Sequence, residues 1–487
     1  MEKAMHQELE SFDVVIIGGG PAGIAGAIEA SNAGYKVALV DAQAELGGAG
    51  VNTGTVPSKT LRETAVALSG MRSRNLHGVD LSLRREVTVT DFLRHERNVK
   101  AGLNTMLTER LQASSATIIH GYGAFEGPHV LGVRGRDGGF RHLRGERILI
   151  ATGSSPVRPT TFSFESPGIY DSDTILSLDR LPKSMAVIGG GVIGSEYACT
   201  FAALGAEVHL IDGRNTILPF LDGEISRALA AAMERGGVRI HWNERASSSS
   251  AAAFEQTRLQ LSSEASLTVD AVLVAAGRTS NTQTLNLHAA GLTASERGLI
   301  GVDEHFRTCV PHIYAAGDVI GFPALASTSV QQGRIAMRHA LGAEGASSTP
   351  RLLPVGVYTI PEVGMVGDTE EALQQQGVEY VIGRGPYRGS SRGRIIGDGD
   401  GFLKLLFRRN DGTLLGVHAI GEQAAELVHI GMIAMMSGAT MQLFDNSCFN
   451  MPTLGELYKL ATLDALLRMR SGRSLTDDLF RAVAPAA

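Results

Sequence analysis

The sequence predicts an α/β protein with two Rossmann-like dinucleotide-binding domains and a C-terminal α+β domain. A glycine-rich turn follows an apolar strand twice, at 18–23 and at 189–194. In each copy an aspartate, Asp41 or Asp212, lies 23 residues after the first glycine. The chain has 487 residues, which is more than one hydrophobic core usually organises, so two or three domains are expected.

The first copy begins with an apolar, mostly β-branched segment at 12–17. Its apolar residues do not alternate with polar ones, which is typical of a parallel strand buried on both faces. After the glycine turn, an alanine-rich segment predicts a helix over 24–33 that is capped by Gly34. A second strand at 36–40 then leads to Asp41 and completes a strand–turn–helix–strand unit.

Each glycine of the first turn has its own task in binding a dinucleotide. Gly18 permits the tight turn, Gly20 lets the backbone approach a pyrophosphate, and Gly23 lets helix and strand pack closely. The helix N-terminus offers free N–H groups and a partial positive charge. Asp41 is suited to accept hydrogen bonds from ribose hydroxyls. The order of strand, turn, helix and acid disfavours a merely structural glycine turn.

The second copy repeats the same order. A strand at 185–188 enters the turn, a helix is expected over 195–204, and a strand at 207–211 ends at Asp212. By the same reasoning this copy binds a second dinucleotide. Its binding residues are Gly189, Gly191, Gly194 and Asp212.

Shifts in composition indicate how the rest of the chain is organised. The serine-rich segment 246–251 predicts a surface loop within the second nucleotide domain, and 343–350 predicts a linker to a third domain. After this linker, strand-like runs precede helix-like runs, an order typical of an α+β module. The strands are expected at 402–407 and 414–420, and the helices at 424–436 and 455–467. The tail after 471 is expected to be poorly ordered.

The overall composition argues against several classes of function. The formal net charge is -6 without a long run of one sign, which disfavours nucleic acid and an anionic membrane surface as partners. Cys199, Cys309 and Cys448 form no CxxC pair, so neither a disulfide framework nor a metal site is expected. The polar N-terminus does not resemble a signal peptide, and no apolar run is long enough to span a membrane. We therefore expect a cytoplasmic protein.

Five further segments accompany the two glycine turns in an order specific to one family. They are 47–59, 148–153, 272–278, 313–318 and 358–364. With them, the chain resembles the flavoprotein disulfide reductases, the dihydrolipoamide dehydrogenase-like family of class I pyridine nucleotide-disulfide oxidoreductases. The resemblance extends over residues 12–469.

This resemblance implies FAD in the first nucleotide domain, NAD(P) in the second, and a homodimer, with a higher oligomer also open. The implied domains are 1–158 with 282–346 for FAD, 159–281 for NAD(P), 350–470 for dimerisation, and a tail at 471–487. The implied FAD-binding residues are Gly18, Gly20, Gly23, Asp41, Gly48, Gly50, Lys59, Thr152, Gly153, Gly317 and Asp318. The implied NAD(P)-binding residues are Gly189, Gly191, Gly194, Glu196, Asp212, Arg214, Gly277 and Arg278.

The resemblance also implies two catalytic residues, Lys59 and Glu196. The family places this lysine beside the flavin and pairs it with this glutamate. A cation near flavin N5 helps to stabilise developing negative charge, and the carboxylate holds the lysine and faces the nicotinamide. Both residues fall in register with independent motifs, which favours this role over a solvated lysine and a surface glutamate.

The chain departs from the family at the redox-active groups. The two cysteines that the family usually carries are replaced by Gly50 and Thr55. The family's acid–base histidine, supplied by the partner subunit, is replaced by Met451, and Glu456 of the same motif then has no imidazole to orient. Because Met cannot transfer a proton, the thiols and their base are missing together. Dihydrolipoamide dehydrogenase and mercuric reductase activities are therefore disfavoured.

Within the family, the chain is most similar to the soluble (Si-specific) pyridine nucleotide transhydrogenases. This similarity implies hydride transfer between NADPH and NAD+ through the flavin, with one nucleotide site used twice. Asp212 suits NAD(H), and Arg214 is near enough in sequence to serve the 2′-phosphate of NADP(H). Three alternatives stay open: an NAD(P)H:quinone or diaphorase-type reductase on the same fold, a dihydrolipoamide dehydrogenase-like protein without dithiol activity, and a non-catalytic flavin- or nucleotide-binding protein.

Overall fold

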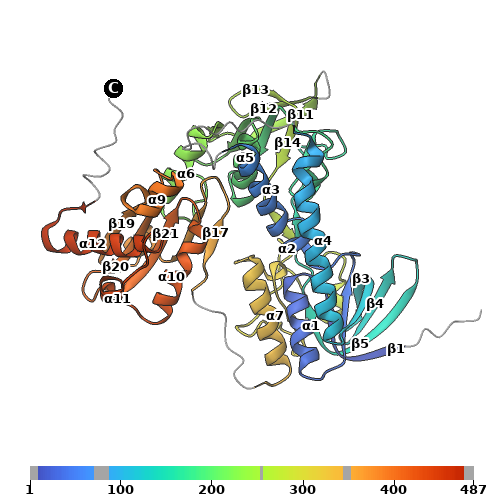
Figure 1. The fold of residues 1–487 in the computed structure, drawn as a ribbon. Coiled ribbons are helices and arrows are strands. Elements are labelled where there is room, and N and C mark those ends of the chain that lie inside the picture. The colour runs from blue at the N-terminus through green and yellow to red at the C-terminus, as the bar shows by residue number, and fades with distance from the viewer. Residues whose placement is uncertain (1–8, 71–86, 253–255, 344–351, 476–487) are drawn as a thin grey trace, which may run out of the picture.

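The computed structural model describes residues 9–70, 87–252, 256–343 and 352–475. Figure 1 shows three units, with the N-terminal unit largely in blue and cyan, the middle unit in green, and the C-terminal unit in orange and red. The predicted α/β class, with a third unit of α+β type, is confirmed. The predicted linker lies, except for Ala343, outside the described residues, as do residues 476–487 of the predicted tail.

The N-terminal unit is built on a six-stranded sheet in which β1, β2, β5 and β16 run parallel and β4 pairs antiparallel with β3 and β5. Its strands are β1 (Leu9–Ile17), β2 (Val37–Asp41), β3 (Thr117–Gly127), β4 (Val130–Gly135), β5 (Phe140–Ile150) and β16 (Ile313–Ala315). Its helices are α1 (Pro21–Asn32), α2 (Gly48–Asn52), α3 (Thr55–Leu68), α4 (Val89–Ala113) and α7 (Ala326–Ala340). Because β16 is distant from β5 in sequence, the chain leaves this unit and later returns to it.

Strand β1 is buried on both faces, as its unbroken apolar run predicts. Val14 and Ile16 pack in one hydrophobic cluster and Val15 packs in another, and all three are fully buried. Helices α1 and α7 lie side by side (Figure 1). They approach closely because Gly333 faces the backbone of Ala22, where a Cβ on the glycine would come within 2.1 Å of the carbonyl oxygen.

The middle unit repeats the parallel sheet, in the order β10–β9–β8–β14–β7. Its strands are β7 (Ile169–Asp171), β8 (Ser184–Ile188), β9 (Glu207–Asp212), β10 (Val238–Trp242) and β14 (Ala271–Val274). Its helices are α5 (Val192–Ala203) and α6 (Gly223–Arg235). The predicted strand–turn–helix–strand order is confirmed here as β8–α5–β9.

The prediction of a surface loop at 246–251 is wrong. These residues form the edge strand β11 (Ala246–Ala251), which pairs antiparallel with β12 (Thr257–Leu261), and β12 pairs with β13 (Ser266–Val269). The serines concealed the strand, because ladder hydrogen bonds use only the backbone and an exposed edge strand needs little apolar surface. Most residues of β11 are indeed exposed.

The C-terminal unit is an antiparallel sheet in the order β17–β18–β21–β20–β19, packed against helices. Its strands are β17 (Val355–Val357), β18 (Val363–Gly367), β19 (Tyr380–Pro386), β20 (Phe402–Arg408) and β21 (Leu414–Ile420). Its helices are α8 (Glu370–Gln375), α9 (Ser391–Ile396), α10 (Ala424–Met436), α11 (Met441–Asn446) and α12 (Glu456–Ser471). Helix α10 contacts β18 and β21, whereas α12 contacts β19 and β20.

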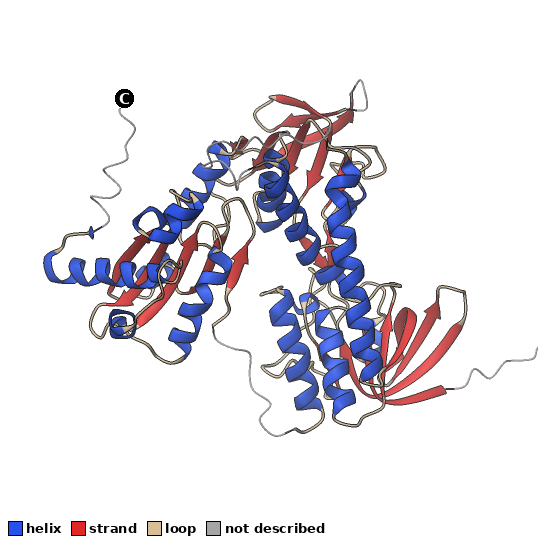
Figure 2. Ribbon diagram, in the orientation of Figure 1, coloured by secondary structure: helices blue, strands red, loops and turns tan. Residues whose placement is uncertain are grey.

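The units are joined by a short ladder and by a shared core. Strands β6 (Ser154–Pro156) and β15 (Arg278–Ser280) pair antiparallel where the chain passes between the first two units. In Figure 2 the long helix α4 extends from the N-terminal unit toward the middle unit. There Phe92 of α4 packs against Phe201 of α5, with ring centroids 6.0 Å apart. In the described ranges, no helix is both long and apolar enough to cross a membrane.

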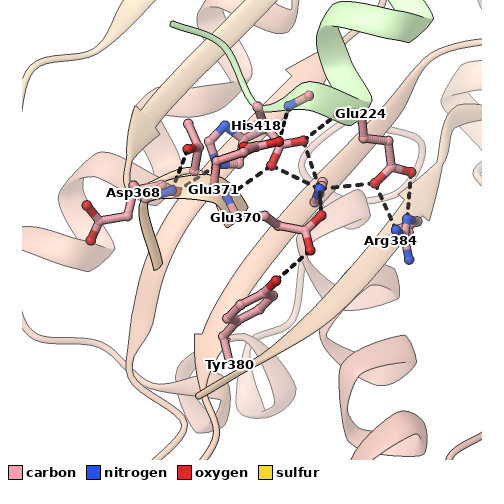
Figure 3. A network of polar contacts seen from close by, with 12 residues as sticks. Glu224, Asp368, Glu370, Glu371, Tyr380, Arg384 and His418 are labelled. Carbon is pink, nitrogen blue, oxygen red and sulfur yellow. Dashed lines mark hydrogen bonds and ion pairs between the residues drawn. The ribbon is translucent and has the colours of Figure 1, made fainter. Parts of the chain in front are cut away.

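A buried polar network joins the middle and C-terminal units (Figure 3). Lys404 of β20 is fully buried, and its ammonium group contacts Asp222 at 2.8 Å, Glu224 at 3.1 Å and also Glu370. Arg384 of β19 forms two further hydrogen bonds to Glu224, each of 2.8 Å. Asp222 and Glu224 belong to the start of α6, so the network fixes the end of this helix on the C-terminal sheet.

Candidate active site

A large cleft opens where the three units meet. Its volume is about 1800 Å³, and residues of all three units line it. Every residue predicted to bind FAD lines the cleft except Gly23. Of the residues predicted to bind NAD(P), Glu196 and Arg278 line it. The fold therefore brings the first glycine turn and the Lys59 segment to one end of α5.

The first glycine turn forms one end of the cleft. Gly18 has a φ of +108°, a conformation that favours glycine, and a Cβ on Gly23 would lie 1.8 Å from the Gly18 carbonyl oxygen. Gly23 thus permits the close packing that was predicted for it. Gly20 precedes α1 without a side-chain cap, and Pro21 occupies the first helical position. The backbone N–H groups of this helix end are therefore available to an anion.

Asp41, at the end of β2, lies beside this turn. Its carboxylate accepts hydrogen bonds from the backbone N–H of Gly19 and, at 2.6 Å, from that of Gln43. The residue is almost buried, and burial raises the pKa of its carboxyl group. The carboxylate is thereby oriented along the wall of the cleft, where its remaining lone pairs can accept hydroxyl groups.

The wall beyond the turn is made by the ends of β5 and β16. The Thr152 hydroxyl donates to the Asn281 carbonyl oxygen at 2.7 Å, and the Asn281 amide donates back to the Thr152 carbonyl oxygen at 2.9 Å. The Ser154 hydroxyl donates to Asp318 at 2.7 Å. Gly317 has a φ of +82°, which favours glycine at this bend. The predicted segments 148–153 and 313–318 therefore meet at the cleft.

Lys59 and Glu196 form an ion pair in the cleft. The Lys59 Nζ lies 2.9 Å from Oε1 and 2.7 Å from Oε2 of Glu196. The glutamate also accepts a hydrogen bond of 3.2 Å from the Ser58 hydroxyl and one of 2.9 Å from the Tyr358 backbone N–H. The side chain of Glu196 is 5% exposed and that of Lys59 is 25% exposed. The glutamate is thus fixed by α3 and by the segment that follows β17, while the lysine lines the cleft.

The positions of the two missing thiols also line the cleft. Gly50 lies on α2 and Thr55 begins α3. A Cβ on Gly50 would lie 2.9 Å from Cγ of Pro21, so even a small side chain would force this neighbour to move. In this part of the cleft wall, Gly50 presents only backbone and Thr55 presents a side chain with a hydroxyl group.

The three cysteines do not replace the missing pair. All three lie in described ranges, and none of them lines the cleft. Cys199 is buried within α5, and burial raises the pKa of its thiol to about 12. Cys309 and Cys448 are exposed and free. A thiol at such positions gives no redox-active group beside the cleft.

Met451 and Glu456 lie away from the cleft of their own chain. Met451 is 67% exposed, in the segment between α11 and α12. Glu456 accepts a hydrogen bond of 2.9 Å from the backbone N–H of Ser391, at the start of α9. This contact gives Glu456 a structural task in the C-terminal unit.

The second glycine turn repeats the geometry of the first. Gly189 has a φ of +106°, and a Cβ on Gly194 would lie 1.8 Å from the Gly189 carbonyl oxygen. Gly191 precedes α5 without a side-chain cap. This turn lies outside the cleft, which reaches the middle unit at Val192 and Glu196. The first turn of α5 therefore connects the second glycine turn with the Lys59–Glu196 pair.

Asp212 and Arg214 are paired at the end of β9. The Arg214 guanidinium donates to both carboxylate oxygens of Asp212, at 2.8 and 2.7 Å, and the backbone N–H of Gly190 donates at 2.6 Å. Burial alone would raise the pKa of Asp212, but these bonds outweigh it and hold the pKa below its ordinary value. Arg214 remains 46% exposed at its side chain, whereas Asp212 is 5% exposed.

Arg278 and Gly277 lie in the passage between the first two units. Gly277 has a φ of +105°. The Arg278 guanidinium donates at 2.8 Å to the Ser154 hydroxyl and at 2.7 Å to the Ser154 carbonyl oxygen. Arg278 is therefore already engaged with the N-terminal unit, although part of it lines the cleft.

Several residues of the cleft were not predicted from the sequence. They are Ser58, Arg136, Asn281, Tyr358 and His429. Ser58 and Tyr358 fall within the family segments 47–59 and 358–364, although no role was predicted for either residue. Arg136 lies in a turn, Asn281 follows β15 and His429 lies on α10, and only the packing of the units brings them to the site.

Two family models match most of the chain. Residues 12–333 match "Pyridine nucleotide-disulphide oxidoreductase", and residues 353–462 match "Pyridine nucleotide-disulphide oxidoreductase, dimerisation domain". The chain is 41% identical over 466 residues to a protein of Mycobacterium tuberculosis named soluble pyridine nucleotide transhydrogenase, covering 95% of this chain and 99% of the relative. A protein of Pseudomonas fluorescens with the same name is 38% identical over 469 residues, covering 94% of this chain and 99% of the relative.

Solved structures with the same fold are also similar in sequence. The HOCl-induced flavoprotein disulfide reductase RclA from Escherichia coli is 29% identical, with a TM-score of 0.84 over 93% of this chain and 99% of that one. LpdA from Mycobacterium tuberculosis is 26% identical, with a TM-score of 0.86 over 93% of this chain and 99% of that one.

Proposed function

Because this chain belongs to the pyridine nucleotide-disulphide oxidoreductase family, we propose that it is an FAD-dependent enzyme that moves hydride between NADPH and NAD+ without a redox-active disulfide. The relatives of highest identity reported above carry the name of this activity. The single observation that carries the proposal is the Lys59–Glu196 ion pair facing a cleft in which Gly50 and Thr55 stand at the thiol positions.

The described residues fit FAD. The cleft of about 1800 Å³ ends at the uncapped start of α1, where a Cβ on Gly20 would still be 3.9 Å from its nearest neighbour, Cα of Gly48. This open cradle of two glycines suits a pyrophosphate. Asp41 would hold the adenosine ribose, and Asp318, oriented by Ser154, would hold the ribityl chain. When bound, FAD supplies an acceptor and donor of hydride.

Lys59 and Glu196 would act beside the nicotinamide and the isoalloxazine. The carboxylate keeps the lysine ammonium at the wall of the cleft, and the ammonium stabilises the negative charge that develops there during hydride transfer. Glu196, in the first turns of α5, links this point to the second glycine turn, which would bind the pyrophosphate of the nicotinamide nucleotide. No proton has to be delivered to a thiolate, so the enzyme needs no histidine at position 451.

One nucleotide site would serve both substrates in turn. Asp212 would accept the 2′-OH of NAD(H), and Arg214 would bind the 2′-phosphate of NADP(H) after leaving Asp212. We further propose that the enzyme is a homodimer, in keeping with the match to a dimerisation domain, and that it works in the cytoplasm. We do not expect nucleic acid or a membrane among its partners.

The proposal is tested by anaerobic stopped-flow on the purified holoprotein. NADPH is expected to bleach the flavin absorbance, and a following pulse of NAD+ or thio-NAD+ is expected to restore it. Because both nucleotides use one site, steady-state rates should follow ping-pong kinetics. Lipoamide and other disulfides serve as the control and should give no turnover.

Two outcomes would overturn this proposal. If NADPH leaves the flavin oxidised, the protein is a nucleotide-binding module and not a transhydrogenase. If NADPH bleaches the flavin but turnover with a quinone far exceeds turnover with NAD+, the enzyme is a quinone or diaphorase-type reductase.

A further inference from the structure

Arg245, in the loop after β10, lies against the end of β9. The backbone N–H of Asn243 donates to the Arg214 carbonyl oxygen at 3.1 Å, and that of Glu244 donates to the Asp212 carbonyl oxygen at 3.0 Å. The Arg245 N–H in turn donates to the Ser262 hydroxyl at 3.1 Å. These bonds fix the loop that carries Arg245 alongside the segment 212–214.

The Arg245 side chain extends across Gly213. A Cβ placed on Gly213 would lie 2.7 Å from Nε of Arg245, 3.3 Å from its Cγ and 3.4 Å from its Cζ. The guanidinium group thus occupies the space that any side chain at 213 would need. Gly213 lies between Asp212 and Arg214, so Arg245 brings a second guanidinium group to this corner of the nucleotide site.

The carboxylate at this corner, that of Asp212, is paired with Arg214 and not with Arg245. Arg214 is bound to Asp212 through both carboxylate oxygens. Burial would raise the pKa of Asp212, but the bonds to its carboxylate outweigh burial and hold the pKa below its ordinary value. The charges of this pair cancel. Among the described residues, the exposed Arg245 guanidinium has no ion pair or hydrogen bond.

We propose that Arg245 is a specificity-determining residue that binds the 2′-phosphate of NADP(H) together with Arg214. This inference rests on the proposed use of NADPH. A phosphate monoester carries about -1.5 to -2 charges near neutral pH. Asp212 and Arg214 together have no net charge, so they do not balance the phosphate even when Arg214 turns toward it. The planar guanidinium suits such a group, and the ribose hydroxyl of NAD(H) in the same place gives it no anionic partner.

The test compares Arg245→Ala with Arg239→Ala, a control at the opposite end of β10 whose exposed side chain pairs with Glu207. Calorimetry measures binding of 2′,5′-ADP and of 5′-AMP, and stopped-flow measures flavin bleaching against NADPH and NADH concentration. The Arg245 variant should bind 2′,5′-ADP and NADPH roughly 10- to 100-fold more weakly, the worth of one charge-assisted contact, and bind 5′-AMP and NADH as the wild type does.

A second variant leaves Arg245 in the chain. Gly213→Val should displace the guanidinium and reproduce the selective loss, whereas Arg239→Ala should leave all four affinities unchanged. The inference is overturned if Arg245→Ala weakens both nucleotide classes equally or neither of them. Calorimetry needs no hydride transfer, so it still decides the role of Arg245 if the proposed transhydrogenase activity fails.

Discussion

At the scale of single residues, the proposed chemistry depends on how Glu196 is held. A carboxylate removed from water is tolerated where several partners satisfy its oxygens. Glu196 of α5 is bound by Lys59 and Ser58, both on α3, and by the backbone N–H of Tyr358, just after β17. The Lys59 ammonium also lies 5.2 Å from the centre of the Tyr358 ring, a cation–π distance.

Replacing Lys59 should slow hydride transfer without removing the cofactor. We expect Lys59→Met to lower the rate of flavin bleaching by NADPH on the order of 100-fold, because a fixed charge beside the reacting atoms is lost. Glu196→Gln should cause a smaller decrease, since the amide can still orient the lysine. Stopped-flow measures both rates, with the FAD content of each variant determined beforehand.

Lys100→Met is the matched control for this prediction. Lys100 forms a longer contact of 3.7 Å with Glu45, and the two side chains are 30% and 58% exposed. Its replacement should not change the rate of bleaching. A Lys59 variant that retains FAD and reacts at the wild-type rate would contradict the assigned role.

Gly50 offers a second prediction at this scale. A Cβ at this position meets Cγ of Pro21 at 2.9 Å, so Gly50→Ala should destabilise the protein by about 1–3 kcal/mol through overpacking. Gly102→Ala, on α4, is the control, since nothing lies within 4 Å of its added methyl group. That change should instead stabilise the protein by about 0.5–1 kcal/mol. Thermal unfolding of the holoproteins measures the change in stability of each variant. Equal shifts in the melting temperature of the two variants would refute the steric argument.

At the scale of elements, the network in Figure 3 holds α6 on the C-terminal sheet. Burial alone would lower the pKa of Lys404, but Asp222 and Glu224 outweigh it and raise the pKa above its ordinary value. The lysine is therefore charged at neutral pH and balances carboxylates from two different units. The two units are thus expected to move as one body.

Removing the Lys404 ammonium group should destabilise the folded protein. We expect Lys404→Met to lower the free energy of unfolding by about 3–5 kcal/mol, because it leaves buried carboxylates without their partner. Lys459→Met is the control: its pair with Asp445 is about one-third exposed, and its loss should cost about 0–1 kcal/mol. Chemical denaturation measures both changes. A Lys404 variant as stable as the control would show that the network does not hold the units together.

The same network should make stability depend on acid pH. Burial holds the pKa of His418 below its ordinary value of 6.5. The unfolded chain therefore binds a proton that the folded chain does not, and stability should fall as the pH decreases below about 6.5. Asp222 and Glu224, whose pKa values are held below 3.8 and 4.5, should contribute a further loss only at lower pH.

His418→Gln isolates the contribution of the histidine. Its free energy of unfolding, measured from pH 7 to pH 5 by denaturation, should change less than that of the wild type. Parallel profiles for the two proteins would mean that His418 is not responsible for this part of the pH dependence.

At the scale of the whole molecule, several large apolar side chains of the C-terminal unit are exposed. Ile433 and Met436 on α10 are 60% and 66% exposed, and Met451 is 67% exposed. They fall within the residues that match the dimerisation domain. Ile433 and Met436 are three residues apart on α10 and therefore lie on the same face. Adjacent exposed apolar groups are typical of a protein interface, which supports the proposal that a second copy covers this unit.

Charges on this surface should separate the subunits. We expect Ile433→Glu combined with Met436→Glu to convert a dimer into monomers, measured by light scattering after size-exclusion chromatography, and to lower transhydrogenase activity. Met106→Glu, at a position on α4 that is 42% exposed, is the control and should leave the dimer intact. A dimer of unchanged stability in the double variant would place the interface elsewhere.

Much of the fold follows from local patterns in the sequence. The two glycine turns are recognisable because the tight bend and the close helix contact leave no space for a side chain at Gly18 and Gly23, or at Gly189 and Gly194. The unbroken apolar runs predict buried parallel strands, because a strand covered on both faces has apolar residues on both. The absence of thiols at Gly50 and Thr55 is also plain from the residues alone. The roles assigned to the site residues remain predictions.

Only the tertiary structure decides which distant residues meet. The backbone N–H of Tyr358 reaches Glu196, Lys404 reaches Asp222, and Arg245 lies over Gly213, and none of these contacts has a signal in the sequence. The strand β11 was missed because its pairing is made by backbone groups. Periodicity and turn chemistry determine how a segment folds against its own neighbours, whereas contacts between units depend on how the completed surfaces dock.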